Sequence, residues 1–125
     1  MKTASEFPTM KKALLTAAFI LFLASPAFAH AHLMSEQPAD GATVTAAPSV
    51  LILTFSEGVS LKFTGVTLAG PSGPVTPGAA TLDAAGTTLS LTLDAPLPAG
   101  TYSVAWHALS TDGHKTTGTY AFTVQ

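Results

Sequence analysis

The chain has 125 residues, of which 47% are hydrophobic and 10% are charged, and it contains no cysteine. The lack of cysteine excludes disulfides, thiolate metal sites and thiol redox chemistry. From residue 30 onward the chain keeps only two lysines and no arginine against six carboxylates, which is a side-chain charge of −4. Nucleic acid and anionic membranes are therefore poor partners, because binding to phosphate groups requires clusters of basic side chains.

The first 29 residues have the pattern of a secretory signal peptide. Lysines precede a short apolar run, 13–23, and small residues stand at Ala27 and Ala29, where a signal peptidase reads the chain. The run is too short to span a bilayer, which takes about 20 residues. We predict that residues 1–29 are a signal peptide and that residues 30–125 form one exported domain, without stable membrane insertion after cleavage. This places it in the periplasm, or outside a cell that has no outer membrane.

Cleavage after Ala29 makes His30 the first residue of the mature protein. Its free α-amine and its imidazole can then bind one metal ion together. Cleavage after Ala31 is an alternative, since Ala29 and Ala31 also have the required spacing, and it would make His32 the terminal residue. His32 also completes an X-X-His terminus, which can bind Cu(II) through backbone amides unless folding engages those amides.

Apolar and polar residues alternate with period two along most of the remaining chain, which predicts strands. The predicted strands are 51–56, 61–69, 88–93, 102–106 and 120–124. Turns rich in Gly and Pro separate them, and the stretch 70–78 is predicted to be a loop within the domain. Short strands at this spacing indicate an all-β sandwich or barrel. The aromatic residues expected in its core are Phe55, Trp106, Tyr120 and Phe122.

The segment between the last two predicted strands carries two metal-binding residue types. Asp112 and His114 stand two apart, so in an extended chain they point to the same side, and Gly113 lets the backbone approach closely. Combined with the amine and ring of His30 they form three nitrogens and one oxygen. That set suits tetragonal Cu(II), although Zn²⁺ accepts the same donors. The competing interpretation is a simple Asp-Gly hairpin turn with an exposed histidine.

Taken in order, the motifs of this sequence resemble those of the CopC family of small periplasmic copper-binding proteins. The resemblance covers essentially the whole mature chain. The matching motifs are His30-Ala31-His32-Leu33, Ser35 to Gly41, Leu53-Thr54-Phe55-Ser56-Glu57, Tyr102 to Trp106, Ser110-Thr111-Asp112-Gly113-His114, and Gly118 to Phe122.

The resemblance implies a seven-stranded Greek-key β-sandwich, cupredoxin-like or immunoglobulin-like. It implies a Cu(II) site made of His30 (amine and ring), Asp112 and His114, with Glu57 nearby as a weak ligand or as an acceptor outside the ligand set. The implied role is copper storage, buffering or delivery in copper homeostasis and resistance. The implied partner is an inner-membrane copper transporter or another copper protein.

The sequence departs from some relatives in its methionines. Those relatives have a methionine-rich loop that binds Cu(I), whose preference is for thioether sulfur. Here the stretch 61–82 has no methionine, and Met34 is the only one after residue 30. We therefore expect a Cu(II)-only protein.

Two other functions compete with this interpretation. Lytic polysaccharide monooxygenases also hold copper with an N-terminal histidine, but Asp112 would occupy a position that oxygen chemistry needs open. A sandwich domain that binds no metal is the third candidate, and its stability would not respond to copper. The sequence offers no catalytic nucleophile or acid–base pair, so we expect a binding protein and not an enzyme.

Overall fold

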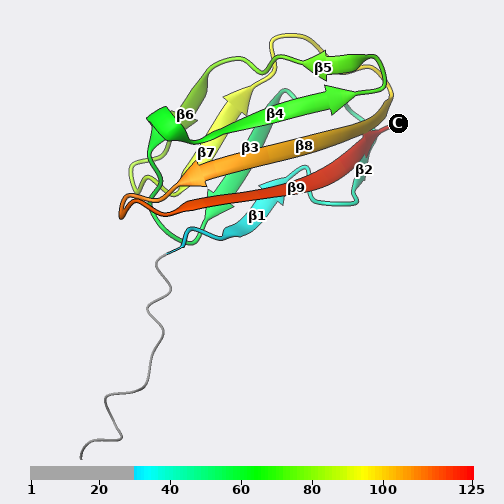
Figure 1. Cartoon of the computed structure of the whole chain (residues 1–125). Helices are drawn as coiled ribbons and strands as arrows, with labels where there is room; N and C mark the ends of the chain where they lie inside the picture. The colour runs from blue at the N-terminus through cyan, green and yellow to red at the C-terminus, as the bar shows by residue number, and fades with distance from the viewer. Residues whose placement is uncertain (1–29) are drawn as a thin grey trace, which may run out of the picture.

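A computed structural model of the protein describes residues 30–125. Two β-sheets pack face to face into a sandwich, which confirms the all-β prediction (Figure 1). The predicted signal peptide, 1–29, and the cleavage after Ala29 lie outside the described residues. Within the described part, no helix has the length and apolar character needed to cross a membrane.

One sheet has four strands and the other has five. The first contains, in spatial order, β1 (Leu33–Gln37), β3 (Val50–Phe55), β7 (Thr88–Thr92) and β6 (Ala80–Leu82). The second contains β2 (Thr43–Val44), β9 (Lys115–Val124), β8 (Gly100–Leu109), β4 (Gly65–Gly70) and β5 (Gly73–Val75). The chain crosses repeatedly between the sheets, while β4–β5, β6–β7 and β8–β9 pair as consecutive strands within one sheet. The strand pairs are antiparallel except for the parallel pair of β2 and β9.

The described residues form nine strands, where the resemblance implied seven. Three of the nine, β2, β5 and β6, have only two or three residues each. All three lie at the edges of their sheets. Short edge strands are a common way to limit pairing with other chains. These three short strands therefore extend the edges of the sandwich without changing its two layers.

Two expectations about the middle of the chain are corrected by the structure. Residues 61–63 form a 3₁₀ turn, η2 (Leu61–Phe63), so the strand predicted over 61–69 begins only at β4. The turn is closed by the amide of Phe63, which donates to the carbonyl of Ser60 at 3.2 Å. The stretch predicted as a loop, 70–78, contains β5, which pairs with β4.

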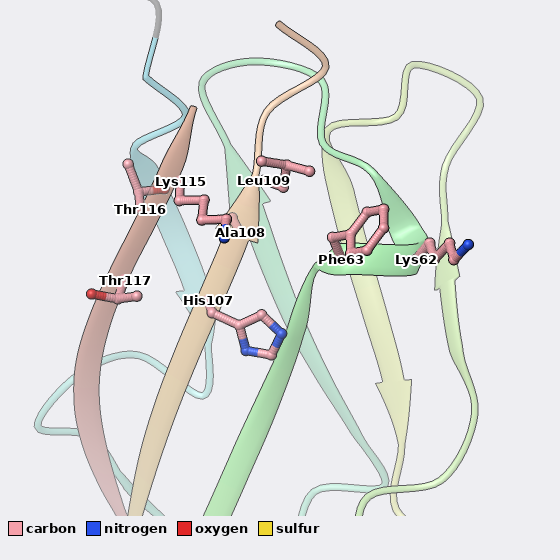
Figure 2. Close-up of a pocket in the computed structure, with 8 residues that line it drawn as sticks. All are labelled: Lys62, Phe63, His107, Ala108, Leu109, Lys115, Thr116 and Thr117. Atoms are coloured by element: carbon pink, nitrogen blue, oxygen red, sulfur yellow. The ribbon is translucent and has the colours of Figure 1, made fainter. Parts of the chain in front are cut away.

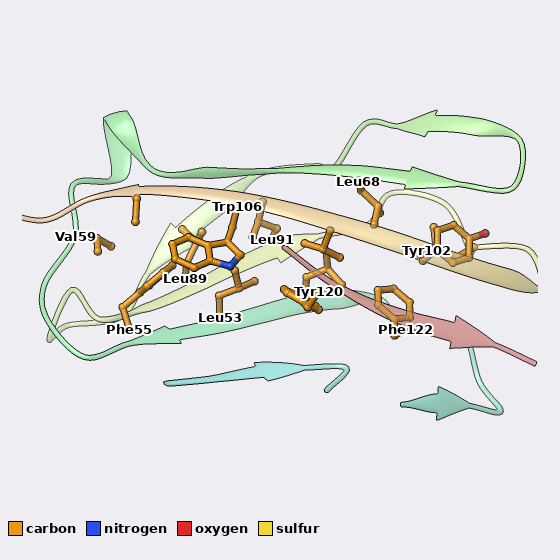
Figure 3. Close-up of a cluster of buried hydrophobic side chains, with 14 of the residues drawn as sticks. Leu53, Phe55, Val59, Leu68, Leu89, Leu91, Tyr102, Trp106, Tyr120 and Phe122 are labelled. Atoms are coloured by element: carbon orange, nitrogen blue, oxygen red, sulfur yellow. The ribbon is translucent and has the colours of Figure 1, made fainter. Parts of the chain in front are cut away.

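The apolar faces of the two sheets meet in one core, drawn in Figure 3. The predicted core aromatics Phe55, Trp106, Tyr120 and Phe122 are all buried. The rings of Phe55 and Trp106 meet edge to face across the two sheets, with centroids 5.4 Å apart, an arrangement that aromatic quadrupoles favour. Because Phe55 ends β3, this contact fixes the position of the two residues that follow, Ser56 and Glu57.

Candidate metal centre

The three residues before β1 form an arm that is held at one end of the sandwich. Ala31 is completely buried, whereas His30 and His32 on either side of it are exposed. The hydroxyl of Thr116 donates to the carbonyl of Ala31 at 2.9 Å. The amide of His32 donates to Ser56 Oγ at 2.8 Å, and the amide of Ser56 donates to the carbonyl of His32 at 2.8 Å. The buried alanine therefore anchors the arm and leaves the two imidazoles outside the core.

The same hydrogen bonds bear on the X-X-His alternative. That mode of Cu(II) binding requires backbone amide nitrogens as ligands. The amide of His32 is already a hydrogen-bond donor to Ser56. The fold thus engages one of the nitrogens that this alternative would use.

The turn between β8 and β9 is organised around Ser110. Its amide donates to the carbonyl of His114 at 2.9 Å, and its hydroxyl accepts from the amide of His114 at 3.2 Å. Gly113 donates its amide to the carbonyl of Ser110 at 2.9 Å and has a φ of 97°, a backbone region that favours glycine. The side chains of Asp112 and His114 meet, with Asp112 Oδ1 3.1 Å from His114 Nδ1. They meet across a turn at 111–113, and not in the extended chain from which the sequence analysis expected them to share a side.

Asp112 is held as a carboxylate by its neighbours. The Ser110 hydroxyl donates to its Oδ1 and is the largest cause that lowers the pKa of Asp112, followed by the hydrogen bond with His114. Both effects favour the charged form of the acid. The side chains of His114 and Asp112 are 50% and 41% exposed. The pair is therefore an accessible anionic group next to an imidazole, which is suited to a cation that arrives from solvent.

The fold brings His30 to this pair across 84 residues of sequence. The rings of His30 and His114 meet edge to face, with centroids 4.8 Å apart and planes inclined at 78°. In Figure 1 the start of the described chain and the β8–β9 turn lie at the same end of the sandwich. Thr116, two residues after His114, bonds to Ala31 and connects the two segments.

Glu57 and His30 line one pocket. His30, His32, Ser56 and Glu57 line an open pocket of about 370 Å³. The structure therefore places Glu57 beside His30, while Asp112 lies beside His114. His30 therefore lies near both candidate acidic residues: it contacts His114, the neighbour of Asp112, and it lines a pocket with Glu57.

The donor types at this end fit a Cu(II) site, but the ligand set is not yet assembled. Within residues 30–125, no group of three or more His, Asp or Glu side chains is arranged to hold a metal ion. In the uncleaved chain the nitrogen of His30 is bonded to Ala29, so it is an amide. Release of residues 1–29 would turn it into an amine, which could join the rings of His30 and His114 and the carboxylate of Asp112 as a nitrogen donor.

The family model of the CopC domain matches residues 33–125, which is most of the chain. The chain belongs to the CopC family. The match includes Glu57, Asp112 and His114, and it begins three residues after His30.

Similarity to individual proteins supports the assignment of the chain to the CopC family. The chain is 44% identical over 100 residues to protein YobA of Escherichia coli K12, with 78% of this chain and 81% of the relative covered. It is 39% identical over 124 residues to copper resistance protein C of Escherichia coli, with coverage of 93% and 98%. The crystal structure of PcoC, a methionine-rich copper resistance protein from Escherichia coli, superposes with a TM-score of 0.69 at 38% identity, covering 78% of this chain and all of that one.

Sequence reasoning missed three residues that position the candidate ligands in this CopC domain. Ser110 organises the turn around His114, Ser56 holds the arm at His32, and Thr116 ties the arm to β9. Ser110 and Ser56 stand within the motifs that carry the resemblance, two residues before Asp112 and one before Glu57 respectively, and this was a usable signal. Thr116 belongs to a run of threonines with no distinguishing pattern.

Proposed function

We propose that this protein is an exported copper-binding protein that takes part in copper resistance. It holds one Cu(II) ion at the end of the sandwich where the N-terminal arm meets the β8–β9 turn. The single observation that carries the proposal is the contact between His30 and His114, in a chain of the CopC family. The relatives named for copper resistance support the choice of copper as the cargo.

We assign the ligands as the amine and ring of His30, the carboxylate of Asp112 and the ring of His114. Three nitrogens and one oxygen are donors that suit tetragonal Cu(II). Asp112 is kept ionised by Ser110, so its charge partly neutralises the ion. Glu57, which lines a pocket together with His30, acts as a weak ligand or as an acceptor for the amine.

The proposal includes processing and oxidation state. Residues 1–29 are removed, residues 30–125 are the copper-binding domain, and the mature protein resides in the periplasm. Met34 is the only methionine among residues 30–125, in contrast to the methionine-rich relative, so we assign no Cu(I) site. The role is storage, buffering or delivery to an inner-membrane transporter or another copper protein. Asp112 at the metal leaves no open position for oxygen chemistry, so we assign no enzymatic activity.

The test is a Cu(II) titration of protein that begins at His30, followed by calorimetry and electron paramagnetic resonance. We expect one Cu(II) per chain with nitrogen-rich tetragonal parameters. His30→Ala and His114→Ala should each weaken binding by more than about tenfold, since even the loss of a group that only supports a ligand costs that much.

His107→Ala is the matched control, because it removes an exposed histidine from β8 while leaving the proposed ligands in place. It should bind copper like the unmodified protein. Unchanged affinity in both His30→Ala and His114→Ala would refute the assigned site.

A further inference from the structure

A second concave site lies on the outer face of the five-stranded sheet (Figure 2). This basic pocket has a volume of about 310 Å³ and is formed by the turn η2 together with the ends of β8 and β9. Its lining residues are Lys62, Phe63, His107, Ala108, Leu109, Lys115, Thr116 and Thr117. None of the proposed copper ligands lines it.

The charge of the domain is distributed unevenly around the basic pocket. Lys62 and Lys115 are the only two strong bases after residue 30, and both line this one pocket. None of the six carboxylates of that part lines it. Within residues 30–125 neither lysine forms an ion pair. The two lysines of this otherwise acidic domain therefore lie at one pocket, and neither is neutralised there by a carboxylate of the described residues.

The rim of the basic pocket is also apolar. Of the three large hydrophobic side chains exposed in the described part, Phe63, at 53%, lines the pocket, and Leu61, at 43%, belongs to the same turn η2 but does not line it. The ammonium group of Lys62 lies 5.4 Å from the centre of the Phe63 ring. Figure 2 shows the side chain of Lys115 extended from β9 toward Ala108 on β8. An apolar wall with cationic groups beside it matches a ligand that has both an apolar side chain and carboxylates.

The basic pocket adjoins the candidate metal centre. Lys115 directly follows His114 in the sequence, and β9 begins at Lys115. Thr116 lines the pocket while its hydroxyl donates to the carbonyl of Ala31, between the two histidines of the arm. A molecule bound in this pocket would therefore lie next to the proposed copper site without covering it.

We propose that the basic pocket is the docking site for an acidic segment of a partner protein, in which an apolar side chain is flanked by Asp or Glu. The apolar side chain enters the pocket against Phe63 and Leu109, and the carboxylates pair with Lys62 and Lys115. Attachment to a membrane is less well supported for two reasons. Two lysines contribute only about 1 kcal/mol each at an anionic bilayer, and the pocket is concave, whereas a membrane surface is flat. That the partner receives or supplies copper rests on the proposed function, whereas the docking itself does not.

The experiment is a titration of isotopically labelled protein, residues 30–125, with the peptide acetyl-Glu-Asp-Leu-Phe-Asp-Glu-amide, monitored by amide chemical shifts. We expect saturable shifts confined to the lining residues, with affinity that falls as salt is added. Lys62→Gln combined with Lys115→Gln should weaken binding on the order of tenfold, since it removes both charges facing the acidic peptide.

Thr45→Glu combined with Thr81→Glu is the matched control, because it changes the net charge by the same two units at exposed positions outside the pocket. It should retain nearly the full affinity. Equal loss in the control would overturn the proposal, because it would show a response to overall charge only. Absence of shifts in the lining residues at millimolar peptide would overturn it too.

Further measurements distinguish a peptide from other ligands of the basic pocket, and distinguish peptide docking from copper binding. Citrate that saturates the same shifts as tightly as the peptide would identify a small-carboxylate site and overturn docking of a segment. Binding to anionic phosphatidylglycerol vesicles without peptide binding would identify a membrane surface instead. His114→Ala should leave the peptide titration of metal-free protein unchanged, even if the copper site fails its own test. Peptide binding that requires copper would overturn the assignment to the basic pocket.

Discussion

Single residues decide which side chains this domain offers to a metal. Ala31 is small and apolar enough to be buried completely, and its burial holds His30 and His32 at the surface. Ser110 orients the candidate ligands of the β8–β9 turn, because its one hydroxyl contacts both Asp112 and the backbone of His114. Neither residue is a metal ligand type, yet the orientation of the candidate ligands depends on them.

The two tyrosines of the chain have opposite hydrogen-bonding states, and this gives a prediction at the residue scale. Tyr102 Oη donates to the carbonyl of Pro98 at 2.6 Å. Tyr120 Oη is buried and has no hydrogen-bond partner in the described part, and burial raises the pKa of this hydroxyl. An unpaired buried polar group costs about 1–3 kcal/mol. Tyr120→Phe should therefore raise the free energy of unfolding by about 1 kcal/mol.

Tyr102→Phe is the matched control for this prediction. It removes the same hydroxyl from a site where the hydroxyl is paired, and should lower the free energy of unfolding by about 1 kcal/mol. Urea denaturation of the two variants and the unmodified protein measures both values. A loss of stability in Tyr120→Phe similar to that in Tyr102→Phe would show that Tyr120 Oη has a partner in solution.

At the scale of elements, the alternation of apolar residues was enough to predict the long strands. The strands β3, β7 and β8 have buried residues at alternate positions, and so does the second half of β9, residues 120–124. The predicted strands 102–106 and 120–124 cover only half of β8 and β9, because the rest of each strand lacks so clear an apolar alternation. The prediction was wrong in 61–63, where a local bond between Ser60 and Phe63 closes a turn. It was also wrong for β5, because pairing of so short a strand with β4 depends on register and not on local pattern.

The hairpin between β6 and β7 depends on one carboxylate, and this makes stability sensitive to pH. Asp83 Oδ1 accepts from the amides of Thr87 at 2.9 Å and Thr88 at 3.0 Å. The Thr88 amide is the largest cause that lowers the pKa of Asp83 below its ordinary value of 3.8. Because the folded state holds this proton less tightly than the unfolded state, unfolding takes up a proton in that window. The stabilisation is complete above pH 3.8 and is lost as the pH falls toward the lowered pKa.

We therefore expect Asp83→Asn to reduce the pH dependence of the free energy of unfolding below pH 3.8. Urea denaturation at a series of acidic pH values measures the slope. Asp83→Ala is the companion variant, since it removes the acceptor as well as the charge and should be less stable than Asp83→Asn at every pH. If Asp83→Asn has the slope of the unmodified protein, other carboxylates account for its acid sensitivity.

At the scale of the whole molecule, the candidate site combines segments from opposite ends of the sequence. Spacing predicted that Asp112 and His114 lie together, but for an extended chain, whereas the folded chain brings them together through a turn with Gly113 at positive φ. No local pattern could predict that His30 meets His114, because their proximity depends on how both sheets are closed by the core. The resemblance to CopC supplied that pairing, and the folded domain provides its means through Ala31 and Thr116.

The free amine at a new N-terminus should determine how strongly Cu(II) stabilises the entire domain. A ligand that binds only the folded state stabilises it by about 2.7 kcal/mol when present at 100 times its Kd. For protein that begins at His30, urea denaturation at a matching free Cu(II) concentration should show a free energy of unfolding higher by about this amount. A chelator should remove the increase. A Gly-Ser extension before His30 converts the amine into an amide, so the same Cu(II) concentration should give a clearly smaller gain.

Without metal the two proteins should unfold at the same urea concentration, because the side chain of His30 is exposed. Equal stabilisation of both by Cu(II) would mean that the amine is not a ligand, and the site would then consist of side chains only.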